Sequence, residues 1–441
     1  MNGQSPFRDT IFALSSGGLP SGVAVIRLSG PQAGDAMTRL AGSLPPPRRA
    51  VLRHLRDKDG TALDRALVLF LPSPASVTGE DCAEFHVHGG RAVVAAVLRA
   101  LGAMPGLRQA EAGEFTRRAF VNGRIDLTGA EGLADLIGAE TEAQRRLALD
   151  NAEGGQRALY AAWRNRLLHA RAMIEAELDF ADEADVPGAV SERIWADMHT
   201  LCGELDAHID GFRAAEIVRD GFRVVLVGAP NAGKSSLLNA LARREVAIVT
   251  DIAGTTRDLV EVSLDLSGMK VLVIDTAGLR ETQDKVERIG VERAVAAAGR
   301  ADLVLELVAP DASGPPAIDG GWTAPTLRVA TKSDLHGSTT PDFDYAISVV
   351  TGEGLGGLIA AIAAHAGTAT TWQGAAVPTR LRHVALLRET GSHVREALMP
   401  DVLELRAEKL RLAGDSLGRI TGAVDVEELL GVIFSQFCIG K

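Results

Sequence analysis

The chain has 441 residues, of which 46% are hydrophobic and 23% charged, a balance typical of folded globular proteins and not of disordered ones. Its net charge of −11 disfavours broad, non-specific binding of nucleic acid, and its aromatic content of 4% disfavours a stacking platform for single strands. Apolar runs fall far short of the roughly 18 residues that a membrane span needs, no targeting signal is evident, and the three cysteines form no C-x-x-C pair. We therefore expect a cytoplasmic protein of several domains, without a membrane association.

Apolar runs separated by turns predict an α+β domain over residues 1 to about 120. The runs "GVAVIRLSG", "RALVLFLP" and "AEFHVHGG" are typical of strands, and "RAVVAAVLRALGAM" is typical of a helix. From about residue 128 to 219 the apolar period becomes helical. Strand and helix signals alternate from 222 to about 367, and a helical pattern returns after 378. This order predicts one helical domain interrupted by an inserted α/β domain.

The segment "VVLVGAPNAGKSSLLNAL" matches the phosphate-binding pattern G-x-x-x-x-G-K-[ST]. Gly228, Gly233, Lys234 and Ser235 hold the fixed positions, after an apolar strand and before a helix. Glycines let backbone N–H groups surround phosphates at a helix N-terminus, while Lys234 would reach the outer phosphates and Ser235 would be a ligand of Mg²⁺. The simpler alternative is a glycine-rich turn between a strand and a helix.

Motifs further along the chain occur in the order of a GTPase, which favours the nucleotide site over the simple turn. "GTTRD" is followed by "VLVIDTAGLR", in which Asp275 ends a strand and is suited to hold Mg²⁺ through water. Gly278 would present its N–H to the terminal phosphate. The guanine-recognition pattern N-K-x-D stands as "TKSD", Thr331 to Asp334, so the asparagine amide is missing. We expect GTP over ATP, with relaxed selectivity as an open alternative.

Leu279 occupies the position at which signalling GTPases have a glutamine that orients the attacking water. A leucine side chain has no group for that task. The nearest carboxylates downstream are Glu281, Asp284 and Glu287, and each of them taken alone is more simply explained as a solvated charge.

These segments, with several others, resemble the MnmE (TrmE) family of tRNA modification GTPases over the whole chain. The resemblance is carried by "DTIFAL", "TGEDCAEFHVHGG", "GEFTRRAFVNGRIDL", "REVAIVTDIAGTTRD", "DTAGLRETQDKVERIG" and "FCIGK". It implies a multi-domain α/β and α fold. A tetrahydrofolate-binding α+β domain would span 1–120, a discontinuous helical domain 121–219 and 371–441, and an inserted Ras-like P-loop G domain 220–370.

The resemblance also implies a homodimer that works in a heterotetramer with an FAD-containing MnmG-type partner. Together they would add an aminomethyl or carboxymethylaminomethyl group to C5 of the wobble uridine, at position 34, of certain tRNAs. The one-carbon unit would come from 5,10-methylene- or 5-formyl-tetrahydrofolate. GTP hydrolysis would require Mg²⁺ and K⁺ and would be activated by dimerisation of the G domains. A partner that makes most of the tRNA contact would explain the acidic chain.

By position, the resemblance assigns roles around GTP. It matches Glu287 to the water-orienting glutamate, Ser235 and Thr256 to the Mg²⁺ ligands, and the following residues to the K⁺ site: Asn231, Thr250, Ile252 and Thr255. An alkali cation beside the phosphates would neutralise developing charge. The residues expected to bind GTP are Asn231, Ala232, Gly233, Lys234, Ser235, Ser236, Thr250, Asp251, Ile252, Ala253, Gly254, Thr255, Thr256, Asp275, Thr276, Ala277, Gly278, Thr331, Lys332, Ser333, Asp334 and Ser348.

In the N-terminal domain the resemblance places Arg27, Glu84 and Arg124 at folate-contacting positions. A carboxylate suits the N–H donors of a pterin, and cations suit a glutamyl tail. The alternative for Arg27 and Glu84 is an ordinary surface ion pair. Glu84, His86 and His88 would share one face of a strand, which would fit a metal, but an ordinary half-buried strand is the preferred interpretation.

The terminal "FCIGK" places Cys438 four residues from the end, where prenylation acts on a C-a-a-X box. Gly440 and Lys441 do not fit that box, so a lipidated signalling switch is disfavoured. The resemblance instead implies that Cys438 is a catalytic residue and that Lys441 lies beside the folate. An inert, buried cysteine is the alternative.

A second class of function stays open, a ribosome-assembly or translational GTPase that acts as a conformational switch. Such a protein would share the phosphate-binding loop and "DTAG". It gives no reason for "GEFTRRAFVNGRIDL" or "FCIGK".

Overall fold

In a computed structural model of the chain, the structure describes residues 6–179, 189–244, 246–248, 260–275, 299–309, 323–336, 342–371, 376–399, 402–424, 430–431, 433–434, 437 and 440. The chain divides into two compact units, one formed by residues 1–134 and 415–441 and the other by residues 135–414. The first unit therefore contains both ends of the chain. Within the described ranges, no helix combines the length and the apolar character that crossing a membrane requires.

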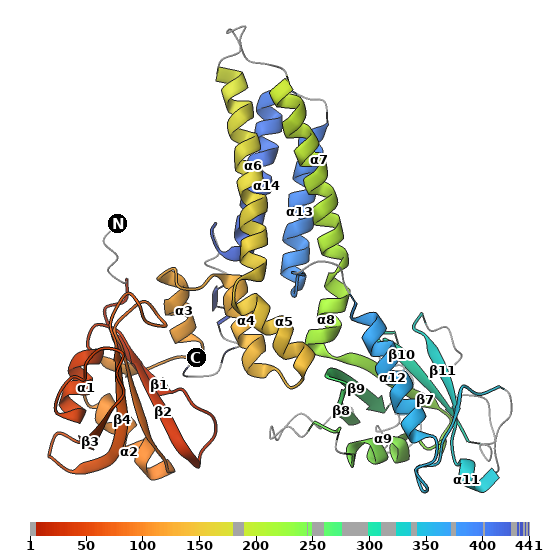
Figure 1. The fold of residues 1–441 in the computed structure, drawn as a ribbon, viewed down its shortest axis with the longest axis horizontal. Helices are drawn as coiled ribbons and strands as arrows, with labels where there is room; N and C mark the ends of the chain where they lie inside the picture. Colours follow the sequence, from red (N-terminus) through yellow and green to blue (C-terminus); the bar gives the residue numbers. More distant parts are fainter. Residues whose placement is uncertain are drawn as a thin grey trace, which may run out of the picture. The chain divides into compact units, whose positions relative to one another are not determined.

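A six-stranded sheet forms the centre of the first unit, in the order β3-β4-β5-β2-β1-β6. Its strands are β1 (Thr10–Leu14), β2 (Ser21–Ser29), β3 (Val51–Arg56), β4 (Ala62–Leu71), β5 (Cys82–Gly89) and β6 (Leu107–Gln109). Helices α1 (Ala33–Ala41) and α2 (Arg91–Gly102) pack with Ile26 and Phe85 in one apolar core (Figure 1). Because side chains alternate along a strand, Arg27 and Glu84 lie on the opposite face.

The opposite face has a smaller apolar cluster at one end. It joins Ile11 and Ala13 of β1 to Ala110 and to Phe115 of helix α3 (Glu114–Val121). The C-terminal segment adds a further cluster, in which Ile433, Phe434 and Phe437 pack with residues at the start of helix α4 (Leu127–Gly138). The last residues of the chain are thus part of the core of the first unit.

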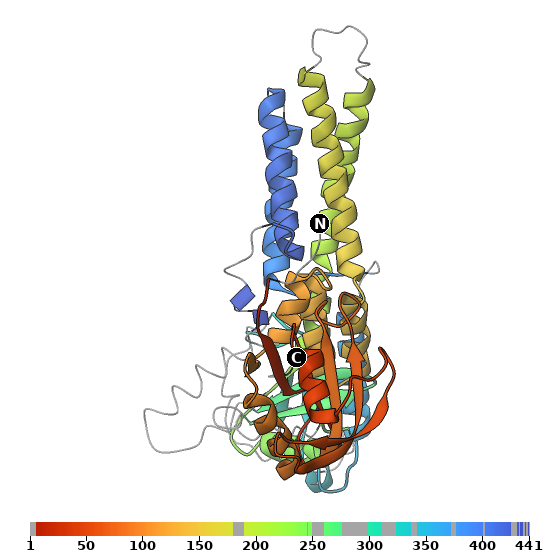
Figure 2. The ribbon, with the colours of Figure 1, turned by 90° about the vertical axis from the view of Figure 1, so that its left-hand side faces the viewer.

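Long helices form one part of the second unit. They are α5 (Glu142–Ala152), α6 (Gly155–Asp179), α7 (Ala189–Asp210), α8 (Phe212–Asp220), α13 (Leu381–Leu398) and the beginning of α14 (Leu403–Thr421). Figures 1 and 2 show α6, α7 and α13 running side by side, and residues of α7 contact both of the other two. The predicted return of helices after the α/β segment is seen in α13 and α14.

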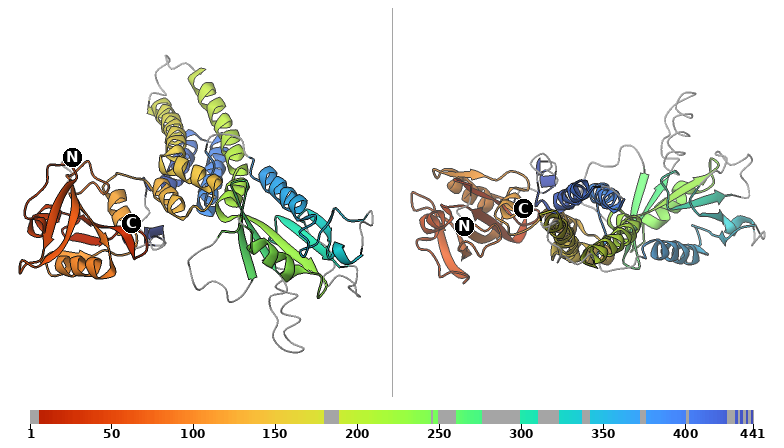
Figure 3. Two further views of the ribbon diagram at one scale, coloured as in Figure 1. Left: turned by 60° about the horizontal axis from the view of Figure 1, so that its bottom comes forward. Right: turned by 90° about the horizontal axis from the view of Figure 1, so that it is seen from above.

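The other part of the second unit is a six-stranded sheet in the order β12-β11-β10-β7-β9-β8. Its strands are β7 (Phe222–Gly228), β8 (Val260–Leu266), β9 (Met269–Asp275), β10 (Leu303–Val308), β11 (Thr326–Ala330) and β12 (Tyr345–Ala346). Only the edge strand β8 is antiparallel to its neighbour. Helices α9 (Lys234–Ala242) and α12 (Leu355–Ala369) share one apolar core with this sheet, and Figure 3 shows α12 lying along it. The predicted combination of an α+β domain, helices and an inserted P-loop α/β sheet is confirmed.

Two side-chain amides fix the points where the chain passes between the helices and the inserted sheet. Gln144 Nε2 donates to the carbonyl oxygen of Arg219, just before β7, at 2.8 Å. Gln156 Nε2 donates to the carbonyl oxygen of Val377, between α12 and α13, at 2.6 Å. Both passages of the chain are therefore held by helices α5 and α6.

Candidate functional site

The predicted phosphate-binding loop connects β7 to α9. Gly228, Asn231 and Gly233 have positive φ values of 151°, 65° and 94°. A Cβ atom on Gly228 would lie 2.3 Å from the Leu307 carbonyl oxygen, so only glycine lets the strand turn away at this point. Gly233 precedes the first turn of α9, whose backbone N–H groups have no partners within the helix. The loop therefore has the backbone shape that binds phosphate at a helix N-terminus.

Lys234 lies against this loop. Its side chain is buried, and Nζ donates to the carbonyl oxygens of Gly228 at 2.7 Å and Ala229 at 2.9 Å. The ammonium group is thus held within the loop itself, at the place where the outer phosphates of a nucleotide would be neutralised.

Ser235 and Asp275 meet beside the loop, as their predicted shared role at Mg²⁺ requires. Ser235 Oγ donates to Asp275 Oδ2 at 2.7 Å. Asp275 is the last residue of β9, is 1% exposed, and pairs in register with Leu226 of β7. A hydroxyl and a carboxylate are the hard oxygen ligands that Mg²⁺ prefers, so these two residues fit the ion.

The predicted guanine-recognition segment lies next to the phosphate-binding loop. Thr331 Oγ1 donates to the carbonyl oxygen of Ala232 at 2.8 Å, and Lys332 has a positive φ of 56°. Ser333 N donates to the Ile347 carbonyl oxygen at 3.1 Å, and Ser333 is followed by the exposed Asp334 in α11 (Ser333–His336). Hydrogen bonds therefore hold this segment to the phosphate-binding loop at Ala232 and to the residue after β12, Ile347.

Ser348, the other residue predicted on the base side, is completely buried. Its Oγ accepts from the backbone N–H groups of Val350 and Thr351, each at 3.2 Å. The hydroxyl thus shapes the turn after β12.

Many of the predicted GTP-site residues lie outside the described residues. They are Thr250, Asp251, Ile252, Ala253, Gly254, Thr255, Thr256, Thr276, Ala277, Gly278 and Glu287. Of the predicted K⁺ ligands, only Asn231 is among the residues that the structure describes. Cys438 and Lys441 are outside them as well.

Arg27 and Glu84 form a pair on the sheet face opposite α1 and α2 of the first unit. They are register partners on β2 and β5, and Arg27 Nε donates to Glu84 Oε1 at 2.9 Å. His86 Nε2 lies 3.0 Å from Glu84 Oε2. Burial raises the pKa of the Glu84 carboxyl, but attraction to Arg27 and hydrogen bonds from His86 and Arg27 outweigh it, and the net pKa is lowered. Glu84 is therefore a buried, ionised acceptor with a cation beside it.

His88 contacts the carboxylate of Asp64 and not that of Glu84. Its backbone N–H donates to Asp64 Oδ2 at 2.8 Å, and its Nδ1 lies 2.8 Å from Asp64 Oδ1. In the part of the chain that the structure describes, no group of three or more His, Cys, Asp or Glu side chains is placed to hold a metal. His86 and His88 therefore contact different carboxylates, Glu84 and Asp64.

The C-terminal Gly440 is packed against the end of β1. Ser15 Oγ donates to the Gly440 carbonyl oxygen at 2.8 Å. Gly440 has a φ of 96°, and a Cβ atom there would lie 2.0 Å from the Leu14 carbonyl oxygen. Ala13, next to Leu14, is the register partner of Arg27. The tail therefore reaches the end of β1, the strand next to the one that carries Arg27. For Arg124, no described hydrogen bond or ion pair joins it to that pair.

The sequence interpretation missed a buried ion network in the first unit. Arg118 is fully buried, and its guanidinium donates to Glu80 Oε2 at 3.1 Å, Asp9 Oδ1 at 2.8 Å and Glu114 Oε1 at 3.1 Å. Ser29 Oγ donates to the same Glu80 oxygen at 2.6 Å, which connects the network to β2. The one available signal was the spacing of Glu114 and Arg118, four residues apart on one helix face.

Comparison with known proteins identifies a family for the chain. The model described as "GTP-binding protein TrmE N-terminus" matches residues 10–124, and the "MnmE helical domain" model matches residues 127–438. The chain belongs to the MnmE (TrmE) family. The expected resemblance is confirmed, and the MnmE helical-domain match includes the inserted sheet together with the helices on either side of it.

Relatives in the family cover almost the whole chain. The "tRNA modification GTPase MnmE" of Mesorhizobium japonicum is 59% identical over 443 residues, which is 98% of this chain and 99% of that protein. The protein of the same name from Rhizobium meliloti is 58% identical over 437 residues, with the same coverage. Among solved structures, the G domain of the T. maritima FeoB iron transporter is similar at 26% identity and covers 33% of this chain and 98% of that chain. Its TM-score of 0.25 is too low to support an argument.

Proposed function

We propose that this protein is a GTP-hydrolysing tRNA modification enzyme of the cytoplasm. Acting as a homodimer with an FAD-containing MnmG-type partner, it would add an aminomethyl or carboxymethylaminomethyl group to C5 of the wobble uridine of certain tRNAs. The names of its near full-length relatives support the tRNA modification and GTPase roles. The observation that supports GTP hydrolysis most directly is the loop in which Lys234 and the bonded pair of Ser235 and Asp275 meet.

Four of the described side chains would contact GTP or its metal ion in different ways. Lys234 would exchange its loop carbonyl partners for phosphate oxygens, and Ser235 would exchange Asp275 for the metal, which Asp275 would hold through water. Mg²⁺ held by Ser235 and Asp275 would neutralise negative charge on the outer phosphates. Asp334 would accept from the guanine N–H donors. Each exchange would replace one polar partner of Lys234 or Ser235 by another, so neither side chain would be left without a partner.

For the hydrolytic step we propose Glu287 as the residue that orients the attacking water, since Leu279 has no suitable group. Asn231, with Thr250, Ile252 and Thr255, would hold K⁺ beside the phosphates. Thr256 would complete the Mg²⁺ ligands. Dimerisation of the G domains would bring these residues together, and GTPase rates in K⁺ and in Na⁺ test the proposal, because equal rates would contradict the K⁺ site.

In the first unit we propose that Arg27 and Glu84, with Arg124 and Lys441, bind a tetrahydrofolate. Glu84 keeps lone pairs that pterin N–H groups could use, and its lowered pKa keeps it ionised as an acceptor. Gly440 packs near these strands, which supports a role of Cys438 and Lys441 at the same site. A reduced folate would supply the one-carbon unit.

The homodimer has support on the adjoining strands. Leu52 of β3 and Leu67 of β4 are register partners and are 45% and 46% exposed. Two neighbouring exposed leucines form apolar surface that a second copy of the chain would cover.

Nucleoside analysis of tRNA tests the proposed function. A strain without this protein should accumulate wobble uridine that lacks the C5 substituent, and a plasmid copy should restore it. A plasmid copy with Lys234→Ala should fail to restore the C5 substituent. A copy with Lys332→Ala separately tests the guanine-recognition segment. Unchanged wobble uridine in the deletion strain would reject the proposal.

A further inference from the structure

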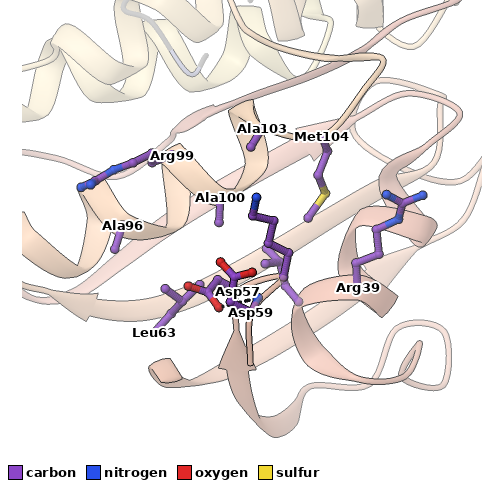
Figure 4. A pocket seen from close by; sticks show the side chains of 11 residues that line it. Arg39, Asp57, Asp59, Leu63, Ala96, Arg99, Ala100, Ala103 and Met104 are labelled. Carbon is purple, nitrogen blue, oxygen red and sulfur yellow. Dashed lines mark hydrogen bonds between the residues drawn. The ribbon is translucent and has the colours of Figure 1, made fainter. Parts of the chain in front are cut away.

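A cavity of about 600 Å³ lies in the first unit, and none of the residues that line it is among those predicted to bind GTP or folate. Its walls come from α1, the turn after β3 and the second half of α2 (Figure 4). The helices α1 and α2 pack on the sheet face opposite the pair of Arg27 and Glu84. The cavity is therefore separate from the proposed folate site.

The cavity has an apolar wall and a charged rim. Leu40, Leu63, Ala96, Ala100 and Met104 supply the apolar side chains. The rim carries the cations Arg39, Lys58 and Arg99. All three are exposed, and within the described residues none of their side chains has a hydrogen-bond or ion-pair partner. Three cations at the mouth of an apolar cavity fit an anionic ligand with a planar or apolar body.

Two carboxylates complete the rim. Asp57 Oδ1 accepts from the backbone N–H groups of Asp59 at 3.0 Å and Thr61 at 2.8 Å, so Asp57 serves the turn. Asp59 is exposed and lines the same cavity, and Figure 4 places it beside Asp57. Because Asp57 is engaged by the turn, Asp59 is the carboxylate of the rim that remains for a ligand. A carboxylate beside three cations suits a ligand that carries N–H donors as well as negative charge, as a nucleotide does.

The charge of the chain is divided unevenly. Residues 1–124 contain 15 Arg and Lys against 10 Asp and Glu, a net charge of +5, although the whole chain carries −11. The remainder, with 31 Arg and Lys against 47 Asp and Glu, carries −16. An RNA backbone would thus be attracted to the part of the sequence that forms this cavity and repelled by the rest.

We propose that the cavity binds one unpaired nucleotide of an RNA chain. Arg39, Lys58 and Arg99 contact its phosphates, Asp59 accepts from N–H groups of the base, and the apolar wall packs against the base. Unpaired nucleotides are the part of RNA whose bases proteins reach. The inference rests on the proposed function, in which tRNA is the substrate, and it assigns this chain a tRNA contact of its own.

Binding of labelled tRNA to the full-length protein, measured over a range of salt concentrations, tests the proposal. The triple variant Arg39→Gln, Lys58→Gln, Arg99→Gln should bind at least about tenfold more weakly, and the slope of log affinity against log salt should fall by about 2 to 3. The control triple Arg49→Gln, Arg65→Gln, Arg117→Gln removes the same charge from exposed positions of the same unit and should have a smaller effect. Equal losses in the two triples would overturn the proposal.

Two further measurements address the cavity itself. Ala100→Phe keeps every charge but fills the apolar wall, so it should weaken tRNA binding while circular dichroism and GTPase rate stay unchanged. Unchanged tRNA affinity in Ala100→Phe would overturn the role of the cavity in holding an RNA base. The same conclusion would follow if a free mononucleotide bound the protein as tightly as tRNA does and did not compete with tRNA. If the unaltered protein bound no tRNA while the nucleoside analysis still showed the modification to depend on it, this inference alone would fail.

Discussion

Thr331 Oγ1 donates a hydrogen bond to the Ala232 carbonyl oxygen at 2.8 Å, which ties the guanine-recognition segment to the phosphate-binding loop across 99 residues of sequence. The sequence suggested weaker guanine recognition at this position, because the asparagine amide of N-K-x-D is missing. The structure shows that the threonine hydroxyl at this position donates to the phosphate-binding loop. Thr331 is 5% exposed, so the bond is protected from water.

Removing this hydroxyl should weaken nucleotide binding. In Thr331→Val the shape is retained but the donor is lost and a buried carbonyl loses a partner, which costs about 1 kcal/mol, or about fivefold in GDP affinity. Titration with a fluorescent GDP analogue measures this. Thr326→Val, at an exposed position of β11, is the control and should bind as the unaltered protein does. Full affinity in Thr331→Val would show that the bond does not organise the site.

The contact between Ser235 and Asp275 predicts a change in Mg²⁺ dependence. Asp275→Asn removes a negative charge without changing the shape of the side chain, so the Mg²⁺ concentration needed for half-maximal GTPase rate should rise by about tenfold or more. Asp265→Asn is a control at the far end of the same strand pair, because Asp265 lies in β8 and its Oδ1 accepts from the Gly268 N–H of the turn to β9. An unchanged Mg²⁺ dependence in Asp275→Asn would remove Asp275 from the metal site.

Glu287→Ala should separate binding from hydrolysis. GTP should bind as before, because the carboxylate acts on water, while single-turnover hydrolysis should lose most of its rate. Glu281→Ala is the matched control among the neighbouring carboxylates. Retained turnover in Glu287→Ala would contradict its proposed role.

The lowered pKa of Glu84 predicts an acid-sensitive first unit. Its ionised form is favoured in the folded chain, so its contribution to stability is complete above the ordinary glutamate pKa and is lost as pH falls below it. Glu84→Gln should therefore be less stable than the unaltered protein at pH 7, and the difference should shrink near pH 3.5. Thermal unfolding at several pH values measures this, with the exposed Glu111→Gln as control. A difference that does not change with pH would exclude the ion pair as its cause.

The position of Gly440 predicts that the tail accepts no side chain there. Gly440→Ala places a Cβ against the Leu14 carbonyl oxygen in a strained conformation, which costs about 1–3 kcal/mol and should displace the tail. We expect loss of tRNA modification with GTP hydrolysis largely unchanged, as for deletion of residues 438–441. Gly431→Ala, where a Cβ meets nothing within 4 Å, is the control. Normal tRNA modification by the Gly440→Ala variant would show that the contact of Gly440 with the end of β1 is not required.

The sequence predicted those features that depend on neighbouring residues. The phosphate-binding loop is a local pattern of glycines between a strand and a helix, and the strand of Glu84 and the helix α2 follow from apolar periodicity. Other contacts join residues far apart in sequence. They are the hydrogen bond from Thr331 to Ala232, the contact between His88 and Asp64, and the ion network around Arg118. No local pattern contains that information, since each depends on which strands become neighbours in the folded sheet.

The first unit cannot be completed until residues 433–440 have emerged from the ribosome. Its sheet lies within residues 10–109, but the cluster around Phe434 and Phe437 and the contact of Gly440 with Ser15 come from residues synthesised more than 300 positions later. The second unit, residues 135–414, is finished earlier and can fold during synthesis. Synthesis through residue 440 is therefore needed to complete the packing of the first unit, and a chain truncated before residue 433 would carry a finished second unit on an unfinished first one.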